Sequence, residues 1–165
     1  MRKRTAVRWA LTFVVLILLV ALISGCSAKT TASKAPTATK RIIYMSAVEY
    51  KGSTSVEKEP YPGQPAPPGG GYKLEEPKDG NWTNSTYRWE PGNITVYQGD
   101  TVELNIWGVN GKEHPSSIEG YVSTFSVKRG QLTKVSFTAD KAGIFAINCT
   151  AHVPSMQGQL VVLPR

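Results

Sequence analysis

The sequence is poor in residues that bind metals through sulfur or imidazole, and its N-terminal part lacks acidic residues. Its 165 residues include two cysteines, two histidines and three methionines. No acidic residue precedes Glu49, so the formal net charge of +7 belongs to the N-terminal part. Residues 42–165 contain 11 basic and 12 acidic residues, a net charge of −1. A domain with this charge balance has no basic surface for a nucleic acid, and we expect no nucleic-acid partner.

Features of a helical bundle and of a disordered chain are missing as well. The 11 prolines and 15 glycines argue against a bundle, and no stretch behind the N-terminus has the pattern of a long amphipathic helix. Apolar residues make up 41% of the chain and charged residues 19%, a composition that excludes wholesale disorder. The length fits one domain of ordinary size behind an N-terminal segment.

The N-terminus resembles the export signal of a bacterial lipoprotein. A basic stretch, Met1–Arg8, precedes an uncharged apolar run that ends in Ile23-Ser24-Gly25-Cys26, which resembles a lipobox. The resemblance implies that residues 1–25 are a cleaved signal peptide and that Cys26 is lipidated. The protein would then be anchored to the outer face of the cytoplasmic membrane, with residues 26–40 as a flexible tether. An uncleaved transmembrane anchor is the alternative, and it places the remainder on the same side.

Apolar residues alternate with polar ones through most of the remaining chain, the pattern of half-buried strands. Turn residues such as Gly99-Asp100 and Lys128-Arg129-Gly130 separate the segments. Short strands with regular turns predict an all-β antiparallel sandwich over residues 41–165. The expected strands are 41–50, 94–97, 101–106, 121–127, 133–138, 144–149 and 159–163. The Pro- and Gly-rich stretch at about 51–81 is expected to be an irregular insertion, either a surface loop or a lid.

The scarce metal-binding side chains gather near the C-terminus. Cys149, His152 and Met156 lie in one expected loop between two strands, and His114 lies in an earlier loop. Two imidazoles and a thiolate with a weak thioether are the ligands of mononuclear copper sites that transfer electrons. Zinc accepts the same nitrogen and sulfur ligands, but structural zinc sites rarely use a thioether.

This pattern resembles that of the cupredoxins, which have one upstream His and a Cys…His…Met series before the last strand. Residues 135–143 (VSFTADKAG), followed by the strand into Cys149, look most like the copper domain of cytochrome oxidase subunit II and nitrous-oxide reductase, and like nitrosocyanin. The resemblance implies a Greek-key β-sandwich that holds one copper ion through His114, Cys149, His152 and Met156. The subunit II centre has two cysteines in its ligand loop, whereas this loop has one, so we expect a mononuclear site.

The resemblance also implies an electron carrier rather than an enzyme, exchanging electrons with a cytochrome, an oxidase or a reductase. A copper carrier or assembly factor, and an oxidase subunit II-like copper domain, are the alternatives. We expect electrons to pass through a partly exposed edge of His152, with Val153-Pro154 and Tyr121 as an apolar collar. Because Pro115 has no N–H, we expect the Cys149 sulfur to accept one backbone hydrogen bond, from Ala151.

Overall fold

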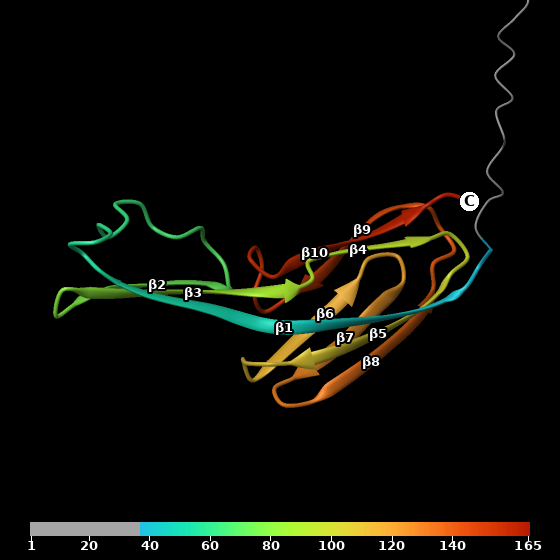
Figure 1. Cartoon of the computed structure of the whole chain (residues 1–165), viewed down its shortest axis with the longest axis horizontal. Helices are drawn as coiled ribbons and strands as arrows, with labels where there is room; N and C mark the ends of the chain where they lie inside the picture. The colour runs from blue at the N-terminus through green and yellow to red at the C-terminus, as the bar shows by residue number, and fades with distance from the viewer. Residues whose placement is uncertain (1–36) are drawn as a thin grey trace, which may run out of the picture. The chain divides into compact units, whose positions relative to one another are not determined.

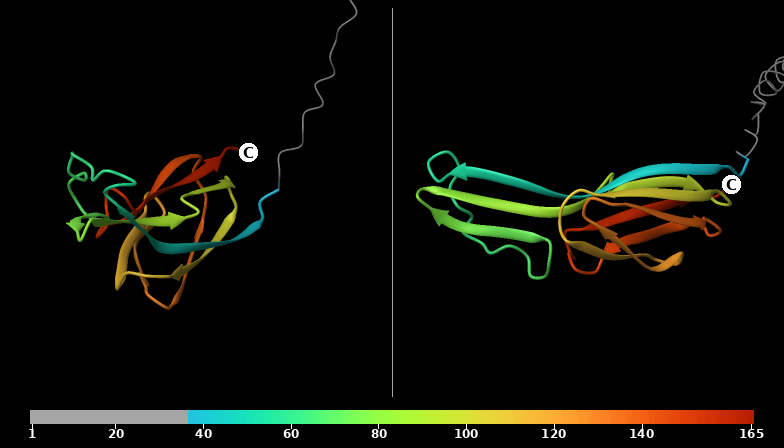
Figure 2. Two further views of the ribbon diagram at one scale, coloured as in Figure 1. Left: turned by 60° about the vertical axis from the view of Figure 1, so that its left-hand side comes forward. Right: turned by 90° about the horizontal axis from the view of Figure 1, so that it is seen from below.

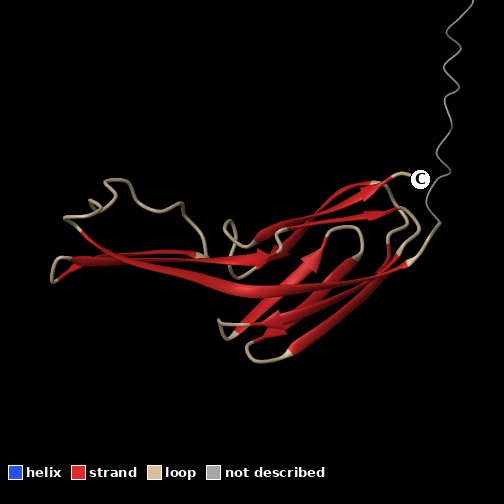
Figure 3. Cartoon of the chain, in the orientation of Figure 1, coloured by secondary structure: helices blue, strands red, loops and turns tan. Residues whose placement is uncertain are grey.

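The computed structural model describes residues 37–165. The predicted signal at 1–25, Cys26 and most of the predicted tether at 26–40 lie outside the described residues. The described part of the chain contains strands and loops and no helix (Figure 3). It therefore has no helix that is long and apolar enough to cross a membrane.

Residues 37–165 form ten strands in two five-stranded sheets (Figure 1). The first sheet has the order β2-β3-β1-β5-β8 and the second has the order β4-β10-β9-β6-β7. The first consists of β1 (Lys40–Ser55), β2 (Tyr72–Lys78), β3 (Asn81–Glu90), β5 (Thr101–Gly108) and β8 (Leu132–Thr138). The second consists of β4 (Asn93–Tyr97), β6 (Glu113–Ile118), β7 (Val122–Lys128), β9 (Gly143–Cys149) and β10 (Gln157–Leu163).

The prediction of an all-β sandwich is confirmed, with one difference in strand direction. Strand β1 pairs with β5 in parallel, and β10 pairs with β4 in parallel, whereas the remaining neighbours are antiparallel. Alternation of apolar residues identifies which face of a strand is buried, but it contains no information on the direction of the neighbouring strand.

The core lies between the two sheets and follows the two-residue period of the strands. In β5 the alternate residues Val102, Leu104 and Ile106 are fully buried, and in β10 Leu160 and Val162 are buried opposite them. Burying such side chains stabilises the fold by roughly 1.5–3 kcal/mol each. The alternation in the sequence therefore specifies the sandwich.

The end of the sandwich at the start of β1 is held together by a buried carboxylate. The side chain of Asp100 accepts hydrogen bonds from the backbone N–H of Thr39 and of Tyr97 and from Nε of Arg41, and it also pairs with Arg165. Burial alone would raise the pKa of Asp100, but these donors and the two cations outweigh burial and hold its pKa well below its usual range. Asp100 thus ties the first and last described segments to the turn before β5.

Strand β1 is longer than the sandwich and continues into a second region. Its first half pairs with β5, and from Ser46 to Ser55 it pairs with β3. Beyond the sandwich, β1, β3 and β2 continue as a single three-stranded layer, drawn at the left of Figure 1. We call this layer the arm: residues 48–55 of β1, 81–88 of β3 and the whole of β2. Figure 2 shows it from two further sides.

The prediction that the whole insertion at about 51–81 is irregular is therefore wrong, because part of it is ordered as strand. Residues 51–55 belong to β1 and residues 72–78 to β2, so the irregular segment is limited to 56–71. This segment covers Trp82 on one face of the arm, where Tyr61 packs edge-on against the indole and the carbonyl of Glu59 accepts its Nε1–H at 2.9 Å. Exposed, polar strands lack the apolar alternation of a sandwich, so the sequence pattern there is typical of a loop.

Candidate metal centre

The segment from Cys149 to Met156 forms a tight loop between β9 and β10. The backbone N–H of His152 donates to the carbonyl of Cys149 at 3.2 Å, and that of Met156 donates to the carbonyl of His152 at 2.8 Å. The N–H of Cys149 donates in turn to the carbonyl of Met156 at 3.1 Å. These bonds fix the direction in which the two ends of the loop present their side chains.

Three of the predicted ligands come together at one point. Nδ1 of His114 lies 3.2 Å from Nδ1 of His152, and the Cys149 sulfur lies 3.9 Å and 3.3 Å from these two atoms. One metal ion bound at about 2.0–2.3 Å from each atom needs ligand atoms separated by about this much. Because thiolate and imidazole are ligands that suit copper, the donor set and its spacing fit the binding of copper.

His114 lies in a strand and not in a loop, which corrects the sequence-based expectation. It is the second residue of β6, its side chain is fully buried, and the exposed Glu113 beside it faces away toward Ser126. Nε2 of His114 lies 2.8 Å from the carbonyl oxygen of Asn110. A carbonyl only accepts hydrogen bonds, so Nε2 carries the hydrogen and Nδ1 keeps its lone pair for a metal.

The loop before β6 needs a glycine to approach this ring. A Cβ atom on Gly111 would lie 2.7 Å from Nε2 of His114, and the residue has a φ of 76°. Both the contact and the conformation exclude most other residues. The loop is anchored by Asn110, whose side-chain oxygen accepts the backbone N–H of Glu49 in β1 at 2.6 Å.

His152 is held by an aromatic ring from β3. The rings of Tyr87 and His152 stack with their centroids 4.0 Å apart, and the Tyr87 ring also meets His114 edge-on at 5.4 Å. Burial lowers the pKa of His152, and the neighbouring His114 lowers it further. Both effects favour the neutral imidazole, which is the form that binds metals. The Tyr87 hydroxyl bonds the carboxylate of Glu49, so Tyr87 connects the arm to the metal centre.

The sulfur of Cys149 is buried and has polar groups of the ligand loop and of β6 close to it. Burial raises the pKa of the thiol, while the backbone N–H groups of Ala151 and His152 and the hydroxyl of Ser116 act in the opposite direction. The backbone N–H of His152 also donates to the carbonyl of Cys149, so the expectation of a single backbone donor to the sulfur, Ala151, stays a prediction. Ser116 is the cross-strand neighbour of Cys149.

The remaining residues predicted for the site or its surroundings are Met156, Cys26 and Tyr121. Met156 is fully buried at the start of β10 and next to Cys149 through a backbone hydrogen bond, and its role as the thioether ligand stays a prediction. Cys26 lies outside the described residues. Tyr121 packs against Phe137 and Phe145 and donates its hydroxyl to the carbonyl of Lys141, so it is not part of a collar with Val153-Pro154.

Residues 69–71 of the irregular segment lie directly against the ligand loop. Gly70 forms a bridge with Pro154, and a Cβ atom on Gly70 would collide with the carbonyl oxygen of Ala151. A Cβ atom on Gly69 would lie 2.7 Å from the carbonyl oxygen of Val153. Three consecutive glycines thus allow backbone to pack on backbone beside His152. The predicted collar is in contact with the chain's own insertion.

Sequence reasoning missed Tyr87, Asn110 and the role of residues 69–71. Tyr87 alternates with Trp89 in a strand, a signal that identifies a sheet position but not its contact with an imidazole. The triplet Gly69-Gly70-Gly71 is the one visible signal, since consecutive glycines often mark a place where another backbone approaches closely.

Comparison with solved structures identifies the fold. A copper nitrite reductase from Nitrosomonas europaea at pH 8.5 is 19% identical, with a TM-score of 0.50, over 76% of this chain and 42% of its own. The multicopper oxidase mgLAC is 20% identical, with a TM-score of 0.51, over 78% of this chain and 40% of its own. The chain has the cupredoxin fold. The chain spans less than half of the length of either of these two proteins.

Comparison with family models and with curated proteins adds no relative. No family model matches the chain, and no curated protein matches it significantly. At identities of 19–20% the solved structures define the fold of this chain, and its activity has to be argued from its own residues.

Proposed function

We propose that this cupredoxin is a mononuclear copper protein that carries single electrons between redox partners outside the cytoplasm, tethered to the membrane through a lipid on Cys26. The observation that supports it most is the packing of His114, Cys149 and His152, with ligand atoms 3.2–3.9 Å apart, at one end of a sandwich. Met156 completes the proposed ligand set. Bound copper would supply one-electron chemistry between Cu(I) and Cu(II).

The surrounding residues keep the ligands in place when the charge of the centre changes by one. The carbonyl of Asn110 orients the ring of His114, and the stacked ring of Tyr87 restrains that of His152. The N–H groups of Ala151 and His152 stabilise negative charge on the Cys149 sulfur. Ligands held by such contacts move little, which favours rapid electron exchange over a reaction that needs an open position.

The alternatives make different demands on the site. A copper carrier needs ligands that a partner protein can reach, whereas His114 and Cys149 are fully buried, which supports an electron carrier. A dinuclear centre like that of oxidase subunit II needs a second thiolate in the ligand loop. In this loop the positions that could offer another ligand are Thr150 and Ser155. Their hydroxyls do not replace a bridging thiolate, so the loop favours a mononuclear site.

Spectroscopy of the copper-loaded protein tests the proposal. We expect added Cu(II) to give an intense visible band from thiolate-to-copper charge transfer and four copper hyperfine lines in electron paramagnetic resonance. Cys149→Ser should abolish the band while the far-ultraviolet circular dichroism stays unchanged. Seven hyperfine lines would contradict a mononuclear site, and an intense band that survives in the Ser variant would contradict Cys149 as the ligand.

The anchor is tested separately by labelling the full-length protein with radioactive palmitate in a bacterial host. We expect label in the wild type and none in Cys26→Ala, because the lipobox places the acyl chains on this residue. Equal labelling of the Ala variant would contradict the proposed attachment and leave the copper site unaffected.

A further inference from the structure

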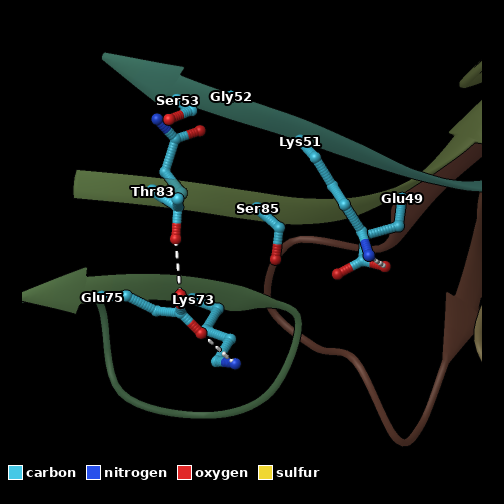
Figure 4. Close-up of a pocket in the computed structure, with 9 residues that line it drawn as sticks. Glu49, Lys51, Gly52, Ser53, Lys73, Glu75, Thr83 and Ser85 are labelled. Atoms are coloured by element: carbon cyan, nitrogen blue, oxygen red, sulfur yellow. Dashed lines mark hydrogen bonds and ion pairs between the residues drawn. The ribbon is translucent and has the colours of Figure 1, made fainter. Parts of the chain in front are cut away.

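One face of the arm is a polar groove that leads to the metal centre. Its distal part has a volume of about 350 Å³ and is lined by side chains from β1, β2 and β3 (Figure 4). Its proximal part has a volume of about 600 Å³ and includes Tyr87, Asn110 and Gly111. The two parts share Glu49, Lys51, Lys73 and Ser85, so they form one continuous groove.

The two parts differ in charge. In the distal part Lys51 pairs with Glu49 at 3.1 Å and Lys73 pairs with Glu75 at 2.5 Å, which leaves it neutral. The proximal part adds Lys112 and Arg129. Among the described residues 37–165, neither of these two cations has a carboxylate within ion-pair distance. The positive charge next to the metal centre is therefore unbalanced, on a domain whose residues 42–165 have a net charge of −1.

The wall between the groove and the metal centre is one residue thick. Tyr87 lines the groove and stacks on His152 at 4.0 Å. Asn110 and Gly111 line it as well, and they touch the ring of His114 through the carbonyl of Asn110 and the α-carbon side of Gly111. A molecule bound in the proximal groove thus lies one aromatic ring away from a ligand of the centre.

We propose that the groove is the docking site of an acidic one-electron redox protein, whose carboxylates pair with Lys112 and Arg129 above Tyr87. This proposal rests on the proposed function and names the partner class. His114, Cys149 and His152 would hold the copper that accepts the one electron a reduced partner gives up, and Tyr87 and His152 lie between the groove and this site. Complementary charge raises the rate of such encounters, and the open, elongated groove suits a protein surface better than a single small ion.

The docking site is tested first in the metal-free protein, with a ten-residue polyglutamate peptide as the acidic probe. In amide nuclear magnetic resonance spectra at low salt, we expect shifts at Tyr87, Gly111, Lys112 and Arg129. The double variant Lys112→Glu/Arg129→Glu should bind the peptide at least tenfold more weakly. The matched control Lys58→Glu/Lys141→Glu changes the charge equally at exposed positions away from the groove and should bind as the wild type does.

Three outcomes of this titration would overturn the proposal. They are shifts that map outside the groove, equal weakening in both double variants, and equally tight binding of inorganic phosphate at the same amides, which would indicate a small-anion site. None of them depends on copper. Failure of the docking proposal is therefore distinguishable from failure of the copper proposal, which the hyperfine pattern decides.

The electron path is tested in the copper-loaded protein, first reduced to Cu(I), with two inorganic one-electron oxidants of opposite charge. We expect the groove variant to react at least tenfold more slowly with the anion hexacyanoferrate(III) and faster with the cation tris(phenanthroline)cobalt(III). The control variant should not show these opposite changes in the two rates. Equal rate changes in the groove and control variants would show that electrons are exchanged elsewhere on the protein.

Discussion

The sandwich and the arm share β1 and β3, yet the two regions are stabilised in different ways. In the sandwich every second residue of β5 is buried between two sheets. In the arm the corresponding positions on one face are charged or hydroxylated, and the other face is covered around Trp82 by a loop. Backbone pairing can thus carry a strand beyond the core that stabilises it. The extension then presents polar groups beside the metal centre.

The difference in packing between the sandwich and the arm is tested by the same substitution in both regions. Leu104→Ala removes a fully buried side chain from the sandwich, and we expect it to lower the free energy of unfolding by about 3–4 kcal/mol. Leu74→Ala, in the half-buried middle of β2, should cost less than about 1 kcal/mol. Urea denaturation of the two variants measures both values. Equal losses would show that the arm is as tightly packed as the sandwich.

The buried carboxylate of the sandwich makes that region sensitive to acid. Because the folded pKa of Asp100 lies below its unfolded value of about 3.9, its contribution is complete above that pH and is lost as the pH falls further. Asp100→Asn should lower stability at pH 7 by about 2–3 kcal/mol and flatten the decline below pH 4. Thermal unfolding between pH 2 and pH 7 provides the measurement. A parallel decline in wild type and variant would exclude Asp100 as its source.

The contact between the insertion and the ligand loop is tested at a glycine. Gly70→Ala introduces a methyl group against the carbonyl of Ala151, and we expect a loss of about 1–2 kcal/mol together with a changed spectrum of the copper-loaded protein. Gly63→Ala is the control, because a methyl group there meets no neighbour. An unchanged spectrum and unchanged stability in Gly70→Ala would mean that the segment does not pack on the ligand loop.

The smallest expected effect concerns the link between Tyr87 and the arm. Tyr87→Phe keeps the ring that stacks on His152 and removes the hydroxyl that bonds Glu49, so it should cost about 0.5–1 kcal/mol and leave the copper spectrum unchanged. Tyr87→Ala removes the stack as well and should shift the reduction potential measured by cyclic voltammetry. Equal potentials in the two variants would show that the ring does not restrain His152.

The part of the molecule that could be predicted is the part with a local pattern. Alternation marked most strands of the sandwich, and the short series Cys149…His152 indicated that these two candidate ligands lie close together. His114 was expected in a loop, although His114 and Pro115 both pair with β7. The arm could not be predicted, since residues such as Lys51 and Ser85 have no apolar alternation and pair only because β1 continues past the core. Contacts between distant segments, such as Tyr87 with His152, have no local signal at all.

The length of β1 also determines the order in which the molecule can fold. This strand is among the first described residues to be synthesised, yet its partners β3 and β5 begin only at Asn81 and Thr101. A strand whose partners lie far along the chain cannot form its sheet until those partners are present. Domains rich in such pairings fold in milliseconds to seconds. During that interval both edges of β1 are open to wrong partners, so its unpaired apolar residues Ile42, Ile43 and Tyr44 are where aggregation would begin.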